Sequence, residues 1–150
     1  MKITDAFLGE HAVFYAQFEE CETMLDRSNL DSLKHAAAVI ASALESHAEL
    51  EDKLLFGPLA IYSDGEPGIF QLMEEEHTAI ANFLGAIAAA KDAGRASELL
   101  SEMMAAARAH FEKEEQVAFP RVEQLLGADE LRRLGREWSA ARGVAVEVTA

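Results

Sequence analysis

Two stretches of the sequence share a pattern that decides how the chain folds: residues 44–56 read LESHAELEDKLLF, and residues 107–119 read ARAHFEKEEQVAF. In each stretch a histidine is followed four residues later by a glutamate and nine residues later by a phenylalanine. Residues four positions apart lie on the same face of an α-helix. We therefore predict that both stretches are helical and that the histidine and glutamate of each point in the same direction.

The same helical spacing extends through most of the chain. Apolar residues and histidines recur every three or four positions, which is typical of helices with one buried face. The face of the second expected helix, for example, includes Leu33, Ile40, His47 and Leu54. The pattern predicts four long helices and a short amphipathic one, at about residues 3–26, 30–56, 68–93, 95–126 and 128–142.

Glycine and proline mark the expected ends of these helices. Gly57–Pro58 should end the second helix, and Gly94 fits the C-cap of the third. Pro120 lies inside the fourth helix and predicts a kink, whereas Gly127 should stop it. Asp64–Gly65 carries a turn signal in the longest connection.

Four long helices with short or medium connections predict an all-α fold. We expect an up-down-up-down four-helix bundle with a short C-terminal fifth helix. The length fits a single domain over residues 1–150, with a core at about residues 3–126 and the short helix at about residues 128–142. The tail from Gly143 is expected to fray.

Composition and charge narrow the classes of function. The 150 residues carry a formal net charge of −14, which repels nucleic acid and anionic membranes, so neither is an expected partner. Cys21 is the single cysteine, which excludes an internal disulfide and fits a small apolar residue on the first helix. Without an apolar run of membrane-spanning length or a targeting leader, we expect a cytoplasmic protein.

Each of the four expected buried faces carries one histidine, and two of them also carry a glutamate. One such histidine would usually be a hydrogen-bonded core residue, but one on every helix is not explained by packing. A buried carboxylate without a partner costs several kcal/mol, so two that face each other need a cation. A dinuclear metal site meets that need, and imidazole with carboxylate suits iron or manganese better than structural zinc. The candidate ligands are His11, His47, Glu51, His77, His110 and Glu114.

This order of histidines and glutamates resembles the hemerythrin-like, or HHE cation-binding, family. Residues 110–120, HFEKEEQVAFP, are similar to the family's His-x-x-x-Glu-Glu-x-x-x-Phe-Pro run, and Glu76 precedes His77 as in the family. The resemblance covers about residues 3–140. It implies two non-haem iron ions, joined by an oxo or hydroxo bridge, that bind dioxygen or a related small ligand. It also implies ligand roles: His11 and His47 for one iron, His77 and His110 for the other, and Glu51 and Glu114 as bridges.

The sequence departs from the respiratory members of that family at two places. Those proteins have His-x-x-x-His on the third helix, and Met73 stands in the first position here. Glu74, three residues before His77, is the candidate for an extra oxygen ligand, against a solvated surface charge. Respiratory members bridge with an aspartate five residues after the fourth-helix histidine, a spacing that Glu115 has. Glu114 matches the helix face better.

The remaining notable side chains have simpler interpretations. His35 lies about 120° around the second helix from His47 and is expected on the surface. Tyr15 follows His11 by four residues and either faces the site, as a hydrogen-bond donor or ligand, or packs at the bundle edge. The methionines, among them Met103, are expected to fill the core.

The sequence leaves three functions open. The first is a dioxygen-binding module. The second is a di-iron stress enzyme that acts on nitric oxide or peroxide, or that donates iron, which a missing histidine ligand would favour because it leaves an open position. The third is an iron- or redox-sensing interaction domain that acts through an unidentified protein partner.

Overall fold

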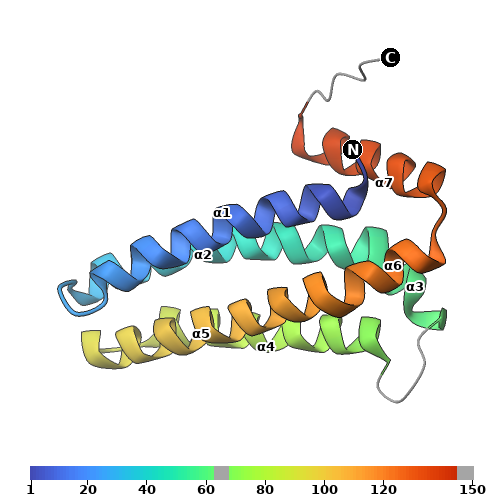
Figure 1. The fold of residues 1–150 in the computed structure, drawn as a ribbon. Coiled ribbons are helices and arrows are strands. Elements are labelled where there is room, and N and C mark those ends of the chain that lie inside the picture. Colours follow the sequence, from blue (N-terminus) through green and yellow to red (C-terminus); the bar gives the residue numbers. More distant parts are fainter. Residues whose placement is uncertain (63–67, 145–150) are drawn as a thin grey trace.

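In the computed structural model, which describes residues 1–62 and 68–144, four long helices lie side by side and alternate in direction (Figure 1). Each helix packs on the next, and the last packs on the first, which closes the bundle. The predicted four-helix bundle is therefore confirmed. Its helices are α1 (Ile3–Met24), α2 (Leu30–Glu51), α4 (Ile69–Ala89) and α5 (Ala93–Lys113).

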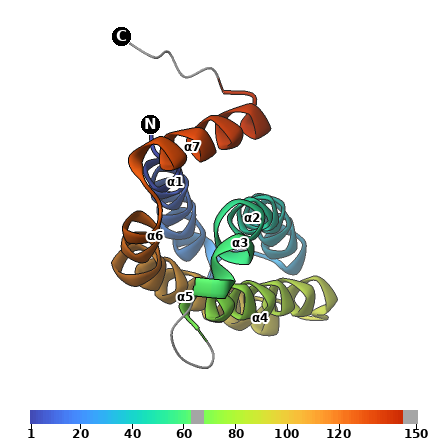
Figure 2. The same cartoon turned by 90° about the vertical axis from the view of Figure 1, so that its right-hand side faces the viewer.

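The fifth helix, α7 (Ala128–Arg142), lies outside the bundle and packs on α1 (Figure 2). Its bounds agree with the predicted short helix. Its own Leu131 and Leu134 are buried. A Cβ at Gly135 would lie 2.5 Å from the carbonyl oxygen of Met1, so a glycine allows α7 to approach the start of α1 this closely.

The C-terminal end of α7 is ordered, where the sequence predicted fraying from Gly143. This glycine has φ 64°, the left-handed conformation that commonly ends a helix. The Val144 N–H then donates a hydrogen bond to the Ser139 carbonyl oxygen, 2.9 Å away. The prediction of fraying is therefore wrong for these two residues, and residues 145–150 lie outside the described chain.

The second long helix does not stop at Gly57–Pro58, contrary to the prediction. It continues as a π-helical turn, η1 (Asp52–Phe56), then as α3 (Gly57–Leu59) and the 3₁₀ turn η2 (Ala60–Tyr62). In the π turn the N–H of Gly57 donates a hydrogen bond to the carbonyl oxygen of Asp52. Pro58 therefore lies in the first turn of the new segment α3, where its missing N–H is not needed. The predicted Asp64–Gly65 turn lies outside the described residues.

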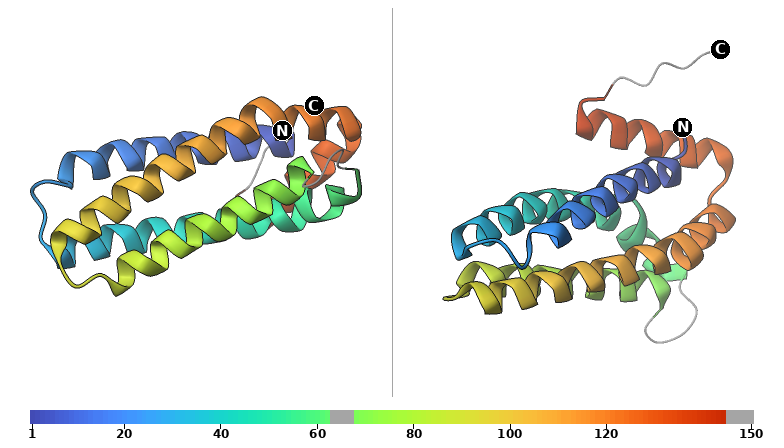
Figure 3. Two further views of the ribbon diagram at one scale, coloured as in Figure 1. Left: turned by 90° about the horizontal axis from the view of Figure 1, so that it is seen from below. Right: turned by 60° about the vertical axis from the view of Figure 1, so that its left-hand side comes forward.

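The fourth long helix contains a second π turn, η3 (Glu114–Ala118), and then α6 (Phe119–Leu125). Pro120 lies in the first turn of α6, and the ribbon changes direction there, as the predicted kink requires (Figure 3). The wider turn exposes Val117, which regular helical spacing from Glu114 would place on the inner face, and buries Ala118 instead. Single π turns inside α-helices are frequently found at functional sites.

The connection between α4 and α5 lies earlier in the chain than predicted, at residues 90–92, and is longer than the single residue expected between the two helices. The third helix ends at Ala89, and Gly94 lies in the first turn of α5 instead of capping the third helix. The cause is Asp92, whose side chain accepts a hydrogen bond of 2.9 Å from the backbone N–H of Arg95 and so starts α5 early.

The bundle interior consists of two apolar clusters separated along its axis. One contains Phe14, Leu44, Ile80 and Ala107, with Met103 and Met104 as the predicted core residues. The other lies toward α6 and α7 and contains Phe7, Phe56, Phe70, Met73 and Phe119. On α1, His11 falls between Phe7 and Phe14, so the polar candidate residues lie between the two clusters. No helix within residues 1–62 and 68–144 has the length and apolar character needed to cross a membrane.

Candidate metal centre

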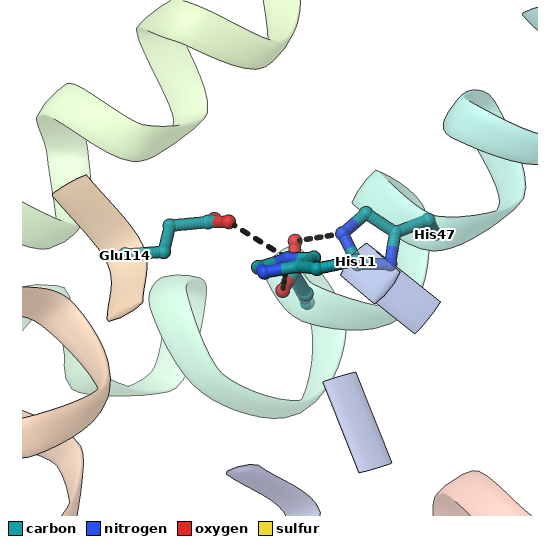
Figure 4. Close-up of side chains that lie close together, drawn as sticks. His11, His47 and Glu114 are labelled. Carbon is teal, nitrogen blue, oxygen red and sulfur yellow. Dashed lines mark ion pairs between the residues drawn. The ribbon is translucent and has the colours of Figure 1, made fainter. Parts of the chain in front are cut away.

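The six candidate residues meet in the middle of the bundle, although they come from four helices. Five of them are fully or almost fully buried, and His77 keeps a small exposed edge. Figure 4 shows the Glu114 side chain reaching from its own helix toward His11, with His47 close by. The arrangement follows from the sequence spacing, because His-x-x-x-Glu places both side chains on the inner face of a helix.

The two buried glutamates each face histidines of several helices. Oε2 of Glu51 lies 3.1 Å from Nε2 of His47 and 3.4 Å from Nε2 of His77, and its Oε1 lies 3.9 Å from Nε2 of His11. Oε1 of Glu114 lies 3.1 Å from Nε2 of His110 and 3.8 Å from Nε2 of His77, and its Oε2 lies 3.2 Å from Nε2 of His11. Both carboxylates therefore stand between the two pairs of histidines.

The six residues divide into two overlapping groups, each of which could hold a metal ion. The ligand atoms within a group all lie within 4.8 Å of one another. The first group, which we call the His11–His47 half, consists of His11, His47, Glu51 and Glu114. The second, the His77–His110 half, consists of His77, His110, Glu51 and Glu114. The two halves share both carboxylates.

The buried polar atoms of these residues fit a bound cation. All four Nε2 atoms and all four carboxylate oxygens are buried without a hydrogen-bond partner, despite the short distances between them. Buried polar groups in folded proteins almost always have partners, and an uncompensated buried carboxylate is strongly unfavourable. Nitrogen and oxygen ligands that converge in this way are the donor set of non-haem iron or manganese sites.

Each histidine presents Nε2 to the centre because its other nitrogen, Nδ1, hydrogen-bonds a carboxylate outside the centre. Such outer carboxylates fix the ring orientation and the tautomer of metal-binding histidines. The four pairs are His47 with Glu10 at 2.6 Å, and His77 with Asp52, His110 with Glu76 and His11 with Glu115, each at 2.9 Å.

These outer carboxylates form a closed ring around the bundle. Each carboxylate contacts the histidine of the next helix along the chain. Glu10 on α1 contacts His47 on α2, and Asp52 at the end of α2 contacts His77 on α4. Glu76 on α4 contacts His110 on α5, and Glu115 in η3 closes the ring at His11 on α1. This ring was not predicted from the sequence. The sequence does contain a sign of it, because each of the four outer carboxylates directly precedes or follows one of the six candidate residues.

The outer contacts also decide the charge on the histidines. Burial lowers the pKa of His47, but the charge of Glu51 and the hydrogen bond to Glu10 outweigh it and raise the pKa to about 9. Burial lowers the pKa of His77 as well, and its hydrogen bond to Asp52 with the charge of Glu51 raises the pKa to about 10. The carboxylates around the site thus favour positive charge at its centre, from protons or from a metal ion.

The other residues singled out from the sequence lie outside both groups. Glu74 is half-buried, and this partial burial together with the charge of Asp52 raises its pKa. Glu115 is an outer hydrogen-bond acceptor, and the Tyr15 hydroxyl donates to it at 3.1 Å, which makes Tyr15 a donor in this network. His35 is exposed, as predicted. Met73 is fully buried in the apolar cluster, and Cys21 is buried as a free thiol.

Access to the centre differs from side to side. The Phe111 ring stacks on His11 with the ring centres 4.1 Å apart, and the Phe119 ring also stacks on His11, at 5.6 Å. Between α2 and α4, in contrast, a cleft of about 400 Å³ is lined by His47, His77 and His110. Its walls are mainly apolar and include Ala48, Ala81, Leu84 and Phe111.

A four-helix bundle with buried histidines and carboxylates at mid-height defines a class of metal-binding helical proteins. The model of the protein family described as "Hemerythrin HHE cation binding domain" matches residues 2–122 and 68–150, which together span nearly the whole chain. The chain belongs to this hemerythrin family, as its motifs had suggested. The comparisons with curated proteins and with solved structures give no match.

Proposed function

We propose that the centre holds two iron ions and binds dioxygen or a related small ligand. His11 and His47 bind one ion, His77 and His110 bind the other, and Glu51 and Glu114 bridge them. The observation that carries this proposal is the set of buried Nε2 and carboxylate atoms that have no hydrogen-bond partner and converge from four helices. Family membership supports a cation as the occupant.

A pair of iron ions supplies a redox-active metal centre with positions open to a small ligand. The chain provides the rest. The outer carboxylates hold each imidazole in the tautomer that leaves Nε2 free. The two apolar clusters keep bulk water from the centre on both sides along the bundle axis. The cleft between α2 and α4 gives a small molecule a route to His47, His77 and His110.

The reaction of the reduced, iron-loaded protein with dioxygen and with nitric oxide tests the ligand-binding role. Either gas should change the visible spectrum in proportion to the iron bound, and removal of the gas should reverse the change for a binding protein. His110→Ala should abolish this response, because the His77–His110 half then lacks an imidazole. An iron-loaded wild-type protein that responds to neither gas would contradict the proposal.

The second candidate, a di-iron stress enzyme, is favoured by one observation. The His77–His110 half offers two imidazoles and two shared carboxylates, because Met73 replaces a third nitrogen and Glu74 is not among the grouped residues. Fewer protein ligands leave more positions for a substrate. Consumption of many equivalents of nitric oxide or peroxide per iron pair, in place of reversible binding, would identify the enzyme.

A further inference from the structure

Glu10 connects the C-terminal helix to the centre. One of its oxygens, Oε2, lies 2.6 Å from Nδ1 of His47. The other, Oε1, accepts hydrogen bonds from Nε of Arg142 at 2.7 Å and from the indole N–H of Trp138 at 2.9 Å. A second guanidinium nitrogen of Arg142 donates to Oε2 at 3.1 Å. One carboxylate therefore bonds two residues of α7 and one candidate ligand.

Arg142 also holds the chain next to His47. Its Nη2 donates to the carbonyl oxygen of Ser46 at 3.2 Å, and Nη1 donates to the Ser46 hydroxyl. The Arg142 and Glu10 side chains are only 22% and 17% exposed, so this ion pair is better shielded than most surface pairs. The last turn of α7 thus fixes both the outer carboxylate of His47 and the backbone just before it.

The other outer carboxylates have different surroundings. Glu76 contacts Lys113 of the next bundle helix, and Glu115 contacts Tyr15 of α1. Asp52 is 35% exposed at the side of the cleft. Among the described residues, Glu10 is the outer carboxylate bonded to a helix outside the bundle. Contacts from α7 therefore act on one half of the centre and not on the other.

We propose that α7 is a clamp that controls metal retention in the His11–His47 half, with Arg142 and Trp138 as positioning residues that act through Glu10. This inference rests on the proposed metal centre. When α7 is docked, Glu10 is fixed and holds the His47 ring toward the ion. When α7 is released, Glu10 and the ring lose that restraint, and this half gives up its metal first. Loss of an outer partner of a metal-bound histidine typically weakens metal affinity about 10–100-fold.

The test compares iron release from two matched variants. Arg142→Met removes the guanidinium but keeps an apolar stem of similar reach. Arg136→Met makes the same change at an exposed position of the same helix and serves as control. Iron-loaded protein is mixed with an excess of a ferrous chelator, and release is followed by absorbance. Arg142→Met leaves Glu10 in place, so it should release one of its two irons faster than wild type by a factor of up to about 10–100, and the other at the wild-type rate.

The fluorescence of Trp138 provides a second and more direct test of the clamp. Trp138 is the single tryptophan, and its indole N–H is bonded to Glu10. Its fluorescence should therefore change when iron is added to the metal-free wild type, and this response should be lost in Arg142→Met. Trp138→Phe, which removes one hydrogen bond but keeps a ring, should accelerate release of the same iron by a smaller factor, and it keeps the test available if Arg142→Met does not fold.

The outcomes separate the clamp from the metal centre. Release of both irons at wild-type rates in Arg142→Met and Trp138→Phe, or equal acceleration of both irons, would overturn the clamp while leaving the centre in place. A wild-type protein that binds no iron would instead overturn the proposed function, and the clamp with it.

Discussion

The two halves of the centre contain the same kinds of residues but are covered differently. In the His11–His47 half, aromatic rings stack on His11, and α7 covers the outer carboxylate of His47, which is 17% exposed. In the His77–His110 half, both histidines line the cleft, and Asp52, the outer carboxylate of His77, is 35% exposed. The first half, which we call the enclosed half, thus meets the cleft through His47 alone, whereas the second, the open half, meets it through both of its histidines.

This difference suggests that the two halves have different roles, although their sets of ligands are nearly the same. The enclosed half has its geometry fixed by rings and by α7, as a site that retains metal needs. The open half has the access route and the position where Met73 stands in place of a nitrogen ligand. We expect ligand chemistry at the open half.

The largest effect should come from Glu51→Ala, because Glu51 belongs to both halves. Loss of a carboxylate shared by two ions should reduce the metal content to one ion per chain or fewer. Glu49→Ala, an exposed glutamate on the same helix, is the charge-matched control and should retain the wild-type metal content. Metal analysis of the two purified variants decides, and two irons in Glu51→Ala would show that Glu51 is not a bridge.

Closing the cleft should affect the rate of ligand binding without affecting the metal. Ala48 lines the cleft between α2 and α4, so Ala48→Trp should fill it and slow azide or nitric oxide binding at least about tenfold, equivalent to about 1.4 kcal/mol on the barrier. Ala38→Trp places the same ring at an exposed position of the same helix, in a groove that contains no residue of the centre, and should bind at the wild-type rate. Equal rates in stopped-flow mixing of all three proteins would mean that ligands reach the iron by another route.

A smaller effect is expected from Met73→His, which restores the nitrogen position of respiratory hemerythrins. The added imidazole should complete the open half, slow autoxidation of the reduced protein and lengthen the lifetime of its dioxygen complex. Because residue 73 is fully buried, the new imidazole should cost about 1–3 kcal/mol of stability in the metal-free protein, where it has no partner. If the wild-type complex is already long-lived and the substitution leaves it unchanged, this departure from the family pattern has no functional meaning.

The smallest effect should come from His35→Ala, the histidine outside the centre. His35 is exposed, so metal content and spectrum should not change, and stability should change by no more than about 0.5 kcal/mol. Thermal unfolding together with metal analysis measures both. Loss of iron would mean that the start of α2 faces the centre differently from the described helix.

The helices and the six inward residues could be predicted because both depend on local spacing. The sequence alone shows a histidine on the expected buried face of each of the four long helices. The helix α7 was also predicted at its observed bounds. The π turns could not be predicted in this way. Gly57–Pro58 indicate that regular helix must be interrupted, but not that a wider turn absorbs the proline and the chain stays helical.

The outer carboxylates were missed for a different physical reason. They bind histidines on neighbouring helices, and helix spacing says nothing about contacts between helices. Glu10 and Glu76 are ordinary surface glutamates by every local measure, in a chain with many acidic residues. Their position next to an inward residue is informative, however, because successive residues of a helix point about 100° apart. A side chain beside an inward one is therefore directed toward the adjacent helix.

The central claim is that two iron ions occupy the two overlapping groups of this bundle. Metal analysis of the protein purified in air, together with its near-ultraviolet and visible spectrum, tests it most directly. We predict about two irons per chain, one for each group, and near-ultraviolet bands from an oxo bridge between them. A protein that contains one metal ion or none, or two metal ions that are not iron, would contradict the claim.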